Sequence, residues 1–529
     1  MSGRLPHPVV SLKMPTLMIR LFCTLMVLGW FAPAMAQPAF DCVAPTAPQL
    51  ASPVVLGNGS PGSVSTATLQ AALDAGGPIR LDIGASTLTV SAELRITRAT
   101  QLDAGGATLS GGNARRVIRV DNPNNQTYTF DLLNATIANG STPTGSGAGL
   151  WKPTGGPWQA VTIRIFHSNF ANNHAIATAQ DDGGGGIYAV GASELSLVDV
   201  MMSGNTGSNG GAIYSLGSKR VNLFDSELSV NTATGTGGNP GNGGNAGAIG
   251  IDGADRYVNL CRVRMLGNQS NAYGAGLFTT VYDTTSFTRI LDSTIQGNNS
   301  VGTSNAHTGG VYLQGGPFSI RGSTFRDNQA AGYGGLSIFD HQTATLIRAS
   351  GDISNSTFVG NIARTGLGGA INLQGSGGLI LQNLTIANNV AQCDVCFAGG
   401  ISNGNGLAIT MRNTVFLNNT GGNAYNPWAM LHPVSGSNNM QWPQTRPVSN
   451  QPETAVTPGA LFANANLGAI ADNGGLTETM ALTAASPAFN AGTASGALPT
   501  DQRGQPRWGA VDIGAYELQA DLIFASGFD

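Results

Sequence analysis

Charged residues are scarce in this chain of 529 residues, and lysine is nearly absent. Asp, Glu, Lys and Arg together make up 10% of the sequence, against about a quarter in an average globular protein. The only lysines are Lys13, Lys152 and Lys219, and the formal net charge is -4. Such a chain offers no basic face for binding a polyanion. The composition therefore argues against a nucleic-acid partner.

Long apolar runs are also missing, apart from one near the N-terminus. Lys13 and Arg20 precede an apolar run over residues 21–32, and the small residues at 34–36 suit a cleavage site. We therefore predict a signal peptide over residues 1–36 and a mature net charge of -7. No later run reaches the roughly 20 apolar residues of a membrane span. We expect an exported protein, extracellular or on the outer cell surface, with no membrane span.

Cysteine is rare, and four cysteines remain after the predicted cleavage. In an exported protein, the spacing of Cys393 and Cys396 favours a disulfide over half of a zinc site, because no second such pair accompanies it. Cys261 lies in a strand-like run, and we interpret it as a buried thiol. The sequence leaves the pairing of Cys42 and Cys261 open.

Glycine, with 75 residues, is abundant, and it recurs within a repeat of roughly 30 residues. Each repeat has a glycine pair before an aliphatic residue, as in Gly210-Gly-Ala-Ile213, and an asparagine three residues after a bulky apolar one, as in Phe325-Arg-Asp-Asn328. Stretches between them alternate as strands do. The repeated asparagines are Asn173, Asn205, Asn231, Asn268, Asn298, Asn328, Asn361, Asn389 and Asn419.

Three short strands per repeat, with glycine at the corners, predict an all-β fold, a right-handed single-stranded parallel β-helix. Equivalent residues of successive coils then stack about 4.8 Å apart. The aliphatic residues form a column in the core, and the asparagines form a hydrogen-bonded amide ladder at a corner. We therefore assign the nine asparagines a structural role.

The spacing of the two phrases indicates one variable edge. From the aliphatic residue to the next asparagine the distance is 17 to 21 residues in all repeats but one, which has 25. From asparagine to the next aliphatic residue it ranges from 8 to 18. The longest loops follow Asn173, Asn231, Asn298 and Asn389. Such an edge is often where a solenoid binds its ligand.

An aromatic row follows the aliphatic column by one position, and alternation points it outward. Two interpretations stay open: an exposed stripe that stacks on sugar rings, or rings half-buried against their own neighbours. The residues are Tyr188, Tyr214, Phe278 and Tyr312.

Both ends of the repeat array need closing, because an open coil exposes its core. Residues 65–75 predict a short helix with a Ser or Thr N-cap and a glycine stop. We assign residues 37–100 to an N-terminal cap with the first irregular coils, 101–420 to the repeats, 421–460 to a linker, 461–517 to an irregular C-terminal cap and 518–529 to a tail.

The glycine and asparagine phrases resemble the repeats of polymorphic outer membrane proteins. Residues 54–419 resemble the bacterial right-handed β-helix family related in fold to pectate lyases. Residues 472–517 resemble the choice-of-anchor Q domain, and 521–529 resemble a tail of exported proteobacterial proteins. The resemblance implies a pectate-lyase-like solenoid ending before a sorting signal.

Candidate catalytic residues are few. Asp181 and Asp182 resemble the paired aspartates of polygalacturonases, but that family's companion motifs are missing. Catalysis, Ca²⁺ binding and a solvated loop all stay open for them, and Asp340 with His341 is a second candidate pair. We expect a monomeric, adhesin-like, non-catalytic protein that binds carbohydrate or another cell-surface ligand. The alternative is a diverged polysaccharide lyase or glycoside hydrolase.

Overall fold

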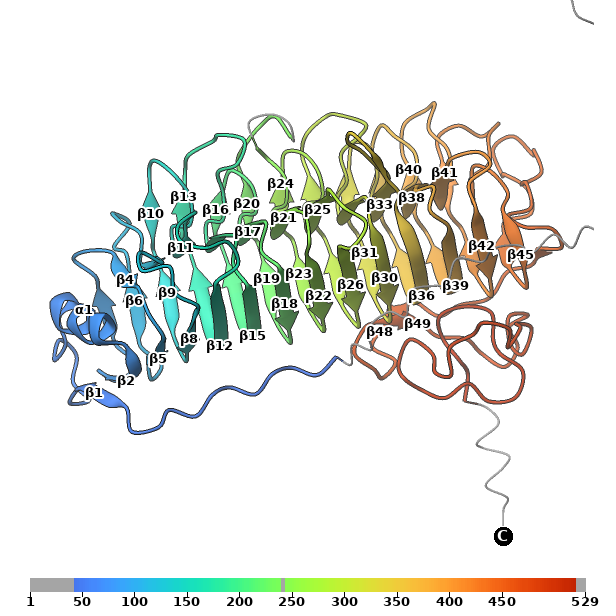
Figure 1. The fold of residues 1–529 in the computed structure, drawn as a ribbon. Helices are drawn as coiled ribbons and strands as arrows, with labels where there is room; N and C mark the ends of the chain where they lie inside the picture. The colour runs from blue at the N-terminus through green and yellow to red at the C-terminus, as the bar shows by residue number, and fades with distance from the viewer. Residues whose placement is uncertain (1–41, 239–242, 520–529) are drawn as a thin grey trace, which may run out of the picture. The chain divides into compact units, whose positions relative to one another are not determined.

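The computed structural model describes residues 42–238 and 243–519, which form a parallel β-helix (Figure 1). One coil runs through β17 (Ile213–Leu216), β18 (Arg220–Phe224), β19 (Glu227–Ser229) and β20 (Thr232–Ala233). A loop then leads to β21 (Ile249–Gly253), which pairs in parallel with β17. The predicted all-β solenoid is confirmed.

Strands of successive coils assemble into three long sheets, of 24, 11 and 10 strands. Ile213 pairs with Ile187 on one side and with Ile249 on the other, so the aliphatic column is in register and fully buried. The 11-stranded sheet, which carries this column, consists of β4 (Leu94–Ile96), β7 (Ile118–Val120), β11 (Leu150–Lys152), β14 (Ile187–Val190), β17, β21, β25 (Leu277–Val281), β29 (Val311–Gln314), β33 (Leu336–Phe339), β38 (Ile371–Gln374) and β41 (Ile401–Asn403).

The asparagine ladder runs without interruption from Asn173 to Asn419. In each step one side-chain amide and one backbone N–H donate to the carbonyl oxygen of the next asparagine, as Asn205 does to Oδ1 of Asn231 at 2.9 and 3.0 Å. The second amide hydrogen goes to the backbone, here to Phe170 at 2.9 Å. From Asn173 to Asn389, both amide hydrogens therefore have an acceptor, one on the next asparagine and one on a backbone carbonyl, an arrangement that fits a structural role.

The N-terminal end is closed by α1 (Thr66–Ala75), at the predicted position. Ser65 caps it by accepting a hydrogen bond from the backbone N–H of Thr68, and Gly76, at φ 74°, ends it. Leu69 and Leu73 are fully buried in the core of the first coils. The helix thus covers apolar side chains that an open coil would expose.

The far end is closed by the segment that the sequence analysis assigned to a linker. β45 (Ser435–Ser437) and β46 (Met440–Trp442) pair with strands of the last repeat, and β47 (Leu461–Phe462) pairs with β46. Met430 and Val456 join the main core. The linker prediction for 421–460 was wrong, because these residues lack the repeat motif yet still fill the last coil.

The segment 463–518 lies along the side of the last coils. Its apolar residues pack with those of β36 (Ser350–Val359), β39 (Leu379–Ala387) and β43 (Val415–Leu417). Gln502 donates to Oγ1 of Thr324 at 2.9 Å, and Arg507 donates to Oδ1 of Asn355 at 2.9 Å. This segment therefore covers an outer face of the β-helix, although we expected it to close the end.

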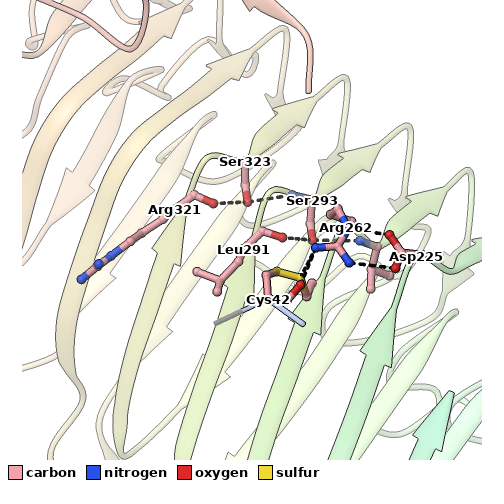
Figure 2. The surroundings of a disulfide bond; sticks show 9 residues. Cys42, Asp225, Arg262, Leu291, Ser293, Arg321 and Ser323 are labelled. Atoms are coloured by element: carbon pink, nitrogen blue, oxygen red, sulfur yellow. Dashed lines mark hydrogen bonds and ion pairs between the residues drawn. A yellow bond between two sulfur atoms is a disulfide. The ribbon is translucent and has the colours of Figure 1, made fainter. Parts of the chain in front are cut away.

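Two disulfides are present. Cys42 is bonded to Cys261, and Arg262 donates to the Cys42 carbonyl at 2.7 Å while pairing with Asp225 (Figure 2). The interpretation of Cys261 as a free buried thiol was therefore wrong. The expected bond between Cys393 and Cys396 is formed in the loop after Asn389. The predicted signal peptide and most of the predicted tail lie outside the described residues.

Candidate functional site

A groove of about 420 Å³ lies where β17, β21 and β25 end, at the turn from the 11-stranded sheet into the next sheet. Loops from four different coils reach it. Its walls include Trp158, Asp181, Leu216, Gly217, Asp252 and Tyr282.

Trp158 forms a fixed aromatic wall of this groove. It belongs to the loop between β11 and β12 (Val161–Ala171), and its indole lies so close to Gly191 and Gly217 that a β-carbon at either position would overlap it. Gln159 anchors the loop by donating from its backbone N–H to the Gly191 carbonyl at 2.8 Å. Yet Trp158 is 58% exposed. One side of the ring is thus held by the glycines while much of its surface faces solvent.

Asp181 comes from the long loop after Asn173, one of the four predicted variable loops. The buried Tyr188 donates from its hydroxyl to the Asp181 carbonyl at 2.8 Å, and Asn209 donates to the Gln180 carbonyl at 2.6 Å. Both contacts fix the backbone, and Asp181 itself is exposed and lines the groove. Of the acidic candidates named from the sequence, Asp181 is thus one that lines this groove.

Asp252 and Tyr282 complete the polar lining. Asp252 lies at the end of β21 and is 9% exposed, while Tyr282 follows β25 and is 46% exposed. Burial, the Asp252 charge and a hydrogen bond with Asp252 raise the pKa of Tyr282 to about 12. The phenol therefore stays protonated at neutral pH and donates its hydrogen bond to the Asp252 carboxylate.

A buried cation lies near these acidic residues. Arg256 is 1% exposed and donates to the Thr280 carbonyl, and burial lowers its pKa to about 10 despite the charges of Asp252 and Asp283. It remains charged at neutral pH but is too buried to contact a ligand. Lys219 lies 3.5 Å from Asp255. The charges that line the groove itself are thus carboxylates.

The side chains of the candidate pair Asp340 and His341 have different partners in the structure. Asp340 accepts hydrogen bonds from the backbone N–H groups of Ala349 and Ser376, at 2.7 and 2.9 Å, so it holds its loop together. His341 instead packs edge-on against Tyr282, with ring centroids 4.8 Å apart, and its Nδ1 lies 2.6 Å from the Val281 carbonyl. Because a carbonyl only accepts, Nδ1 carries the proton there. His341 therefore supports the groove through Tyr282.

Asp181 and Asp182 also differ in their surroundings. Asp182 accepts from the backbone N–H of Ala179 at 3.2 Å and from Oγ of Ser146 at 3.3 Å. Only Asp181 lines the groove. Within residues 42–238 and 243–519, no group of three or more His, Cys, Asp or Glu could hold a metal ion. The same part of the chain contains no helix long and apolar enough to cross a membrane.

The outward aromatic row is buried, so the exposed-stripe interpretation was wrong. Tyr188 and Tyr312 are 8% and 7% exposed, and Tyr214 and Phe278 are 1% exposed. The rings of Tyr188 and Tyr214 pack against each other, and those of Phe278 and Tyr312 do the same, with centroid distances of 5.9 and 5.5 Å. They point away from the core but are covered by other residues. Their surroundings leave no face free for a sugar.

The sequence analysis missed Trp158, Asp252 and Tyr282. Each follows or ends a strand of the 11-stranded sheet, at the turn into the next sheet. Pairing of Asp252 with Thr280, two residues before Tyr282, places these residues on neighbouring coils. An alignment of this turn across the repeats would have pointed to these three residues. The sequence analysis did not align it, because the turn belongs to neither repeated phrase.

No family model matches the chain, and no curated protein matches it. Among solved structures, pectate lyase Pel9A is 15% identical, covering 88% of this chain and 95% of that one, with a TM-score of 0.27. Tailspike protein 3 of bacteriophage CBA120 is 12% identical, covering 78% and 62%, at 0.29. The Streptococcus pneumoniae surface protein and adhesin PfbA is 11% identical, covering 70% and 98%, at 0.27. Similarities of this extent carry no information on function.

Proposed function

We propose that this protein is an exported, adhesin-like β-helix that binds carbohydrate in the groove beside Trp158. The observation that supports this is the indole itself, which is braced by Gly191 and Gly217 and still 58% exposed. An aromatic ring offers a pyranose an apolar face, and the adjacent carboxylates and phenol can bind its hydroxyl groups.

An exported location is supported by the two disulfides, which persist in oxidising compartments. The signal-peptide pattern in residues 1–36 and the resemblance of 472–517 to the choice-of-anchor Q domain agree with it. The repeats that resemble those of polymorphic outer membrane proteins would then present the groove at the cell surface or in the medium.

The test compares Trp158→Ala with Trp508→Ala on a glycan array and by titration calorimetry. Trp508 is a matched control, because it is 50% exposed and lies in the segment along the side of the last coils. We expect Trp158→Ala to lower the affinity for the bound glycan about tenfold or more, as the loss of a stacking aromatic does. Equal binding by both variants would contradict the proposal.

A glycoside hydrolase is the second candidate, favoured by one observation. Asp181 and Asp252 come from different coils and line the same groove, and a pair of carboxylates is the machinery of most glycosidases. Incubation of the protein with each bound glycan, followed by a reducing-end assay, separates the two functions. New reducing ends that disappear in Asp252→Asn would establish the hydrolase.

A further inference from the structure

The charges around the groove are mostly negative. The charged residues on its wall are Asp181 and Asp252, with Asp182, Asp255 and Asp283 in adjacent turns. The basic residues in or directly after these turns are Lys219, Arg220 and Arg256, and none of them lines the groove. Lys219 is paired with Asp255, and Arg256 is buried. A ligand that enters the groove therefore meets carboxylates and no exposed cation that is free of a partner on the groove wall.

A polyuronate is a poor ligand for such a site. Each of its carboxylates would approach Asp181 and Asp252 with the same sign of charge, and no lining arginine or lysine could neutralise it. Removing its hydration without a new partner is costly. Ligands of the acidic type that pectate lyases in general act on are thus disfavoured by the groove itself.

A cation beside an aromatic ring is, in contrast, well matched. The carboxylate of Asp181 can accept charge-assisted hydrogen bonds from an ammonium group, and the indole of Trp158 and the phenol ring of Tyr282 attract a cation placed over their faces. Both rings line the same groove as the two carboxylates and are about half exposed. A sugar with a free amine can use all of these groups at once.

We propose that the groove selects a glycan of hexosamine units that carry free amines, a chemistry found in deacetylated amino-sugar polymers. The inference rests on the proposed carbohydrate-binding function and names the substrate class of the same site. The pyranose ring packs on Trp158, while its ammonium group lies beside the exposed Asp181, and the buried charge of Asp252 adds to the negative potential of the groove.

The experiment uses the full mature chain and three oligosaccharides of equal length: chitosan, its fully acetylated counterpart and oligogalacturonate. Calorimetric titrations are run below the pKa of the amine, at low salt and at about 0.15 M salt, where exposed charges are screened beyond about 8 Å. The variants are Asp181→Asn, Asp252→Asn and Trp158→Ala. Asp199→Asn is the control, because Asp199 is 64% exposed and pairs with His167 away from the groove.

We expect chitosan to bind more tightly than the acetylated oligosaccharide and oligogalacturonate not to bind. Asp181→Asn should weaken chitosan binding about tenfold to a hundredfold, the loss expected for one hydrogen bond between charged groups. Asp199→Asn should leave it unchanged. Equal losses for Asp181→Asn and Asp199→Asn would reduce the effect to the net charge of the protein and overturn the inference.

The inference and the proposed function fail in different ways. If the acetylated oligosaccharide binds as tightly as chitosan, and Trp158→Ala weakens both while Asp181→Asn weakens neither, the groove binds carbohydrate but does not select an amine. If Trp158→Ala changes the binding of no oligosaccharide, the proposed function itself is wrong. Asp252 is buried, so Asp181→Asn, at an exposed position, keeps the test independent of folding.

Discussion

Replacement of one ladder asparagine, Asn298→Ala, tests the physical basis of the fold. Asn298 is fully buried in the middle of the ladder. Its side-chain amide donates to Oδ1 of Asn328 and to the Met265 carbonyl, both at 2.9 Å. Its oxygen accepts from the side chain and from the backbone N–H of Asn268, at 2.9 and 3.0 Å. Alanine removes all four hydrogen bonds.

The expected loss of unfolding free energy is about 4 kcal/mol, at about 1 kcal/mol for each neutral hydrogen bond. The backbone N–H of Asn268 also stays buried without the acceptor it has now, which adds to the cost. Water cannot readily replace the lost partner in a tightly packed corner. The loss is concentrated in the coils that contain Asn268 and Asn328.

Urea unfolding monitored by circular dichroism measures the free energy, and hydrogen exchange by mass spectrometry locates the change. Both are needed, because a solenoid can unfold in part. Protection should fall in the peptide containing Asn268. Asn124→Ala, at an exposed loop position, is the control and should change stability by less than about 0.5 kcal/mol. A loss below about 1 kcal/mol for Asn298→Ala, with protection unchanged, would refute the reasoning.

Three further predictions concern the corners, the disulfides and the groove. Asp292 is partly buried, and burial raises its pKa, so its contribution to stability is present below its ordinary pKa of about 3.9 and is lost as pH rises through the raised value. Asp292→Asn, which matches Asn355 and Asn383 at equivalent corners, should therefore raise the melting temperature at neutral pH and not at acid pH; a lower melting temperature at neutral pH would contradict this. The double variant Cys42→Ser/Cys261→Ser should lose up to about 5 kcal/mol by the chain-entropy model and Cys393→Ser/Cys396→Ser about 2 kcal/mol, since the sequence separations are 219 and 3; equal losses in urea unfolding would refute the ordering. Gly191→Ala should displace the Trp158 indole, because the new β-carbon would overlap the ring. The φ of 59° at residue 191 would also cost alanine about 1–2 kcal/mol of backbone strain. Tryptophan fluorescence should shift, and glycan affinity should fall as in Trp158→Ala. Unchanged glycan affinity would contradict the prediction that Gly191 holds the Trp158 ring in its binding position.

The repeated part of the molecule could be predicted from the sequence because each coil has the same local requirements for burial and hydrogen bonding. Each coil has an aliphatic residue, such as Ile213, that must be buried, and an asparagine, such as Asn205, whose buried amide needs hydrogen-bond partners. Stacking similar coils meets both requirements. Ser65 and Gly76 marked the ends of α1 for equally local reasons. Such signals lie within a few residues of one another, so sequence spacing alone carries them.

What failed from sequence was everything that depends on contacts outside the repeat. Residues 421–460 have no motif, yet Met430 and Val456 are drawn into the core because the last coil would otherwise be open. Tyr188 and Tyr214 point outward as alternation requires, but they are covered there. Alternation decides the face of a strand, not what covers that face.

The sequence by itself determined the solenoid, its core column, its amide ladder and its helical cap. All of these follow from short-range periodicity and from the stacking of equivalent residues in successive coils. Only the tertiary structure decided that Cys42 meets Cys261 across 219 residues, and that Trp158, Asp181, Asp252 and Tyr282 meet in one groove. Trp158 and Asp181 come from one coil, Asp252 and Tyr282 come from two others, and the four residues share no motif. Stacking brings them together, because each coil places its turn beside the turn of the coil before it.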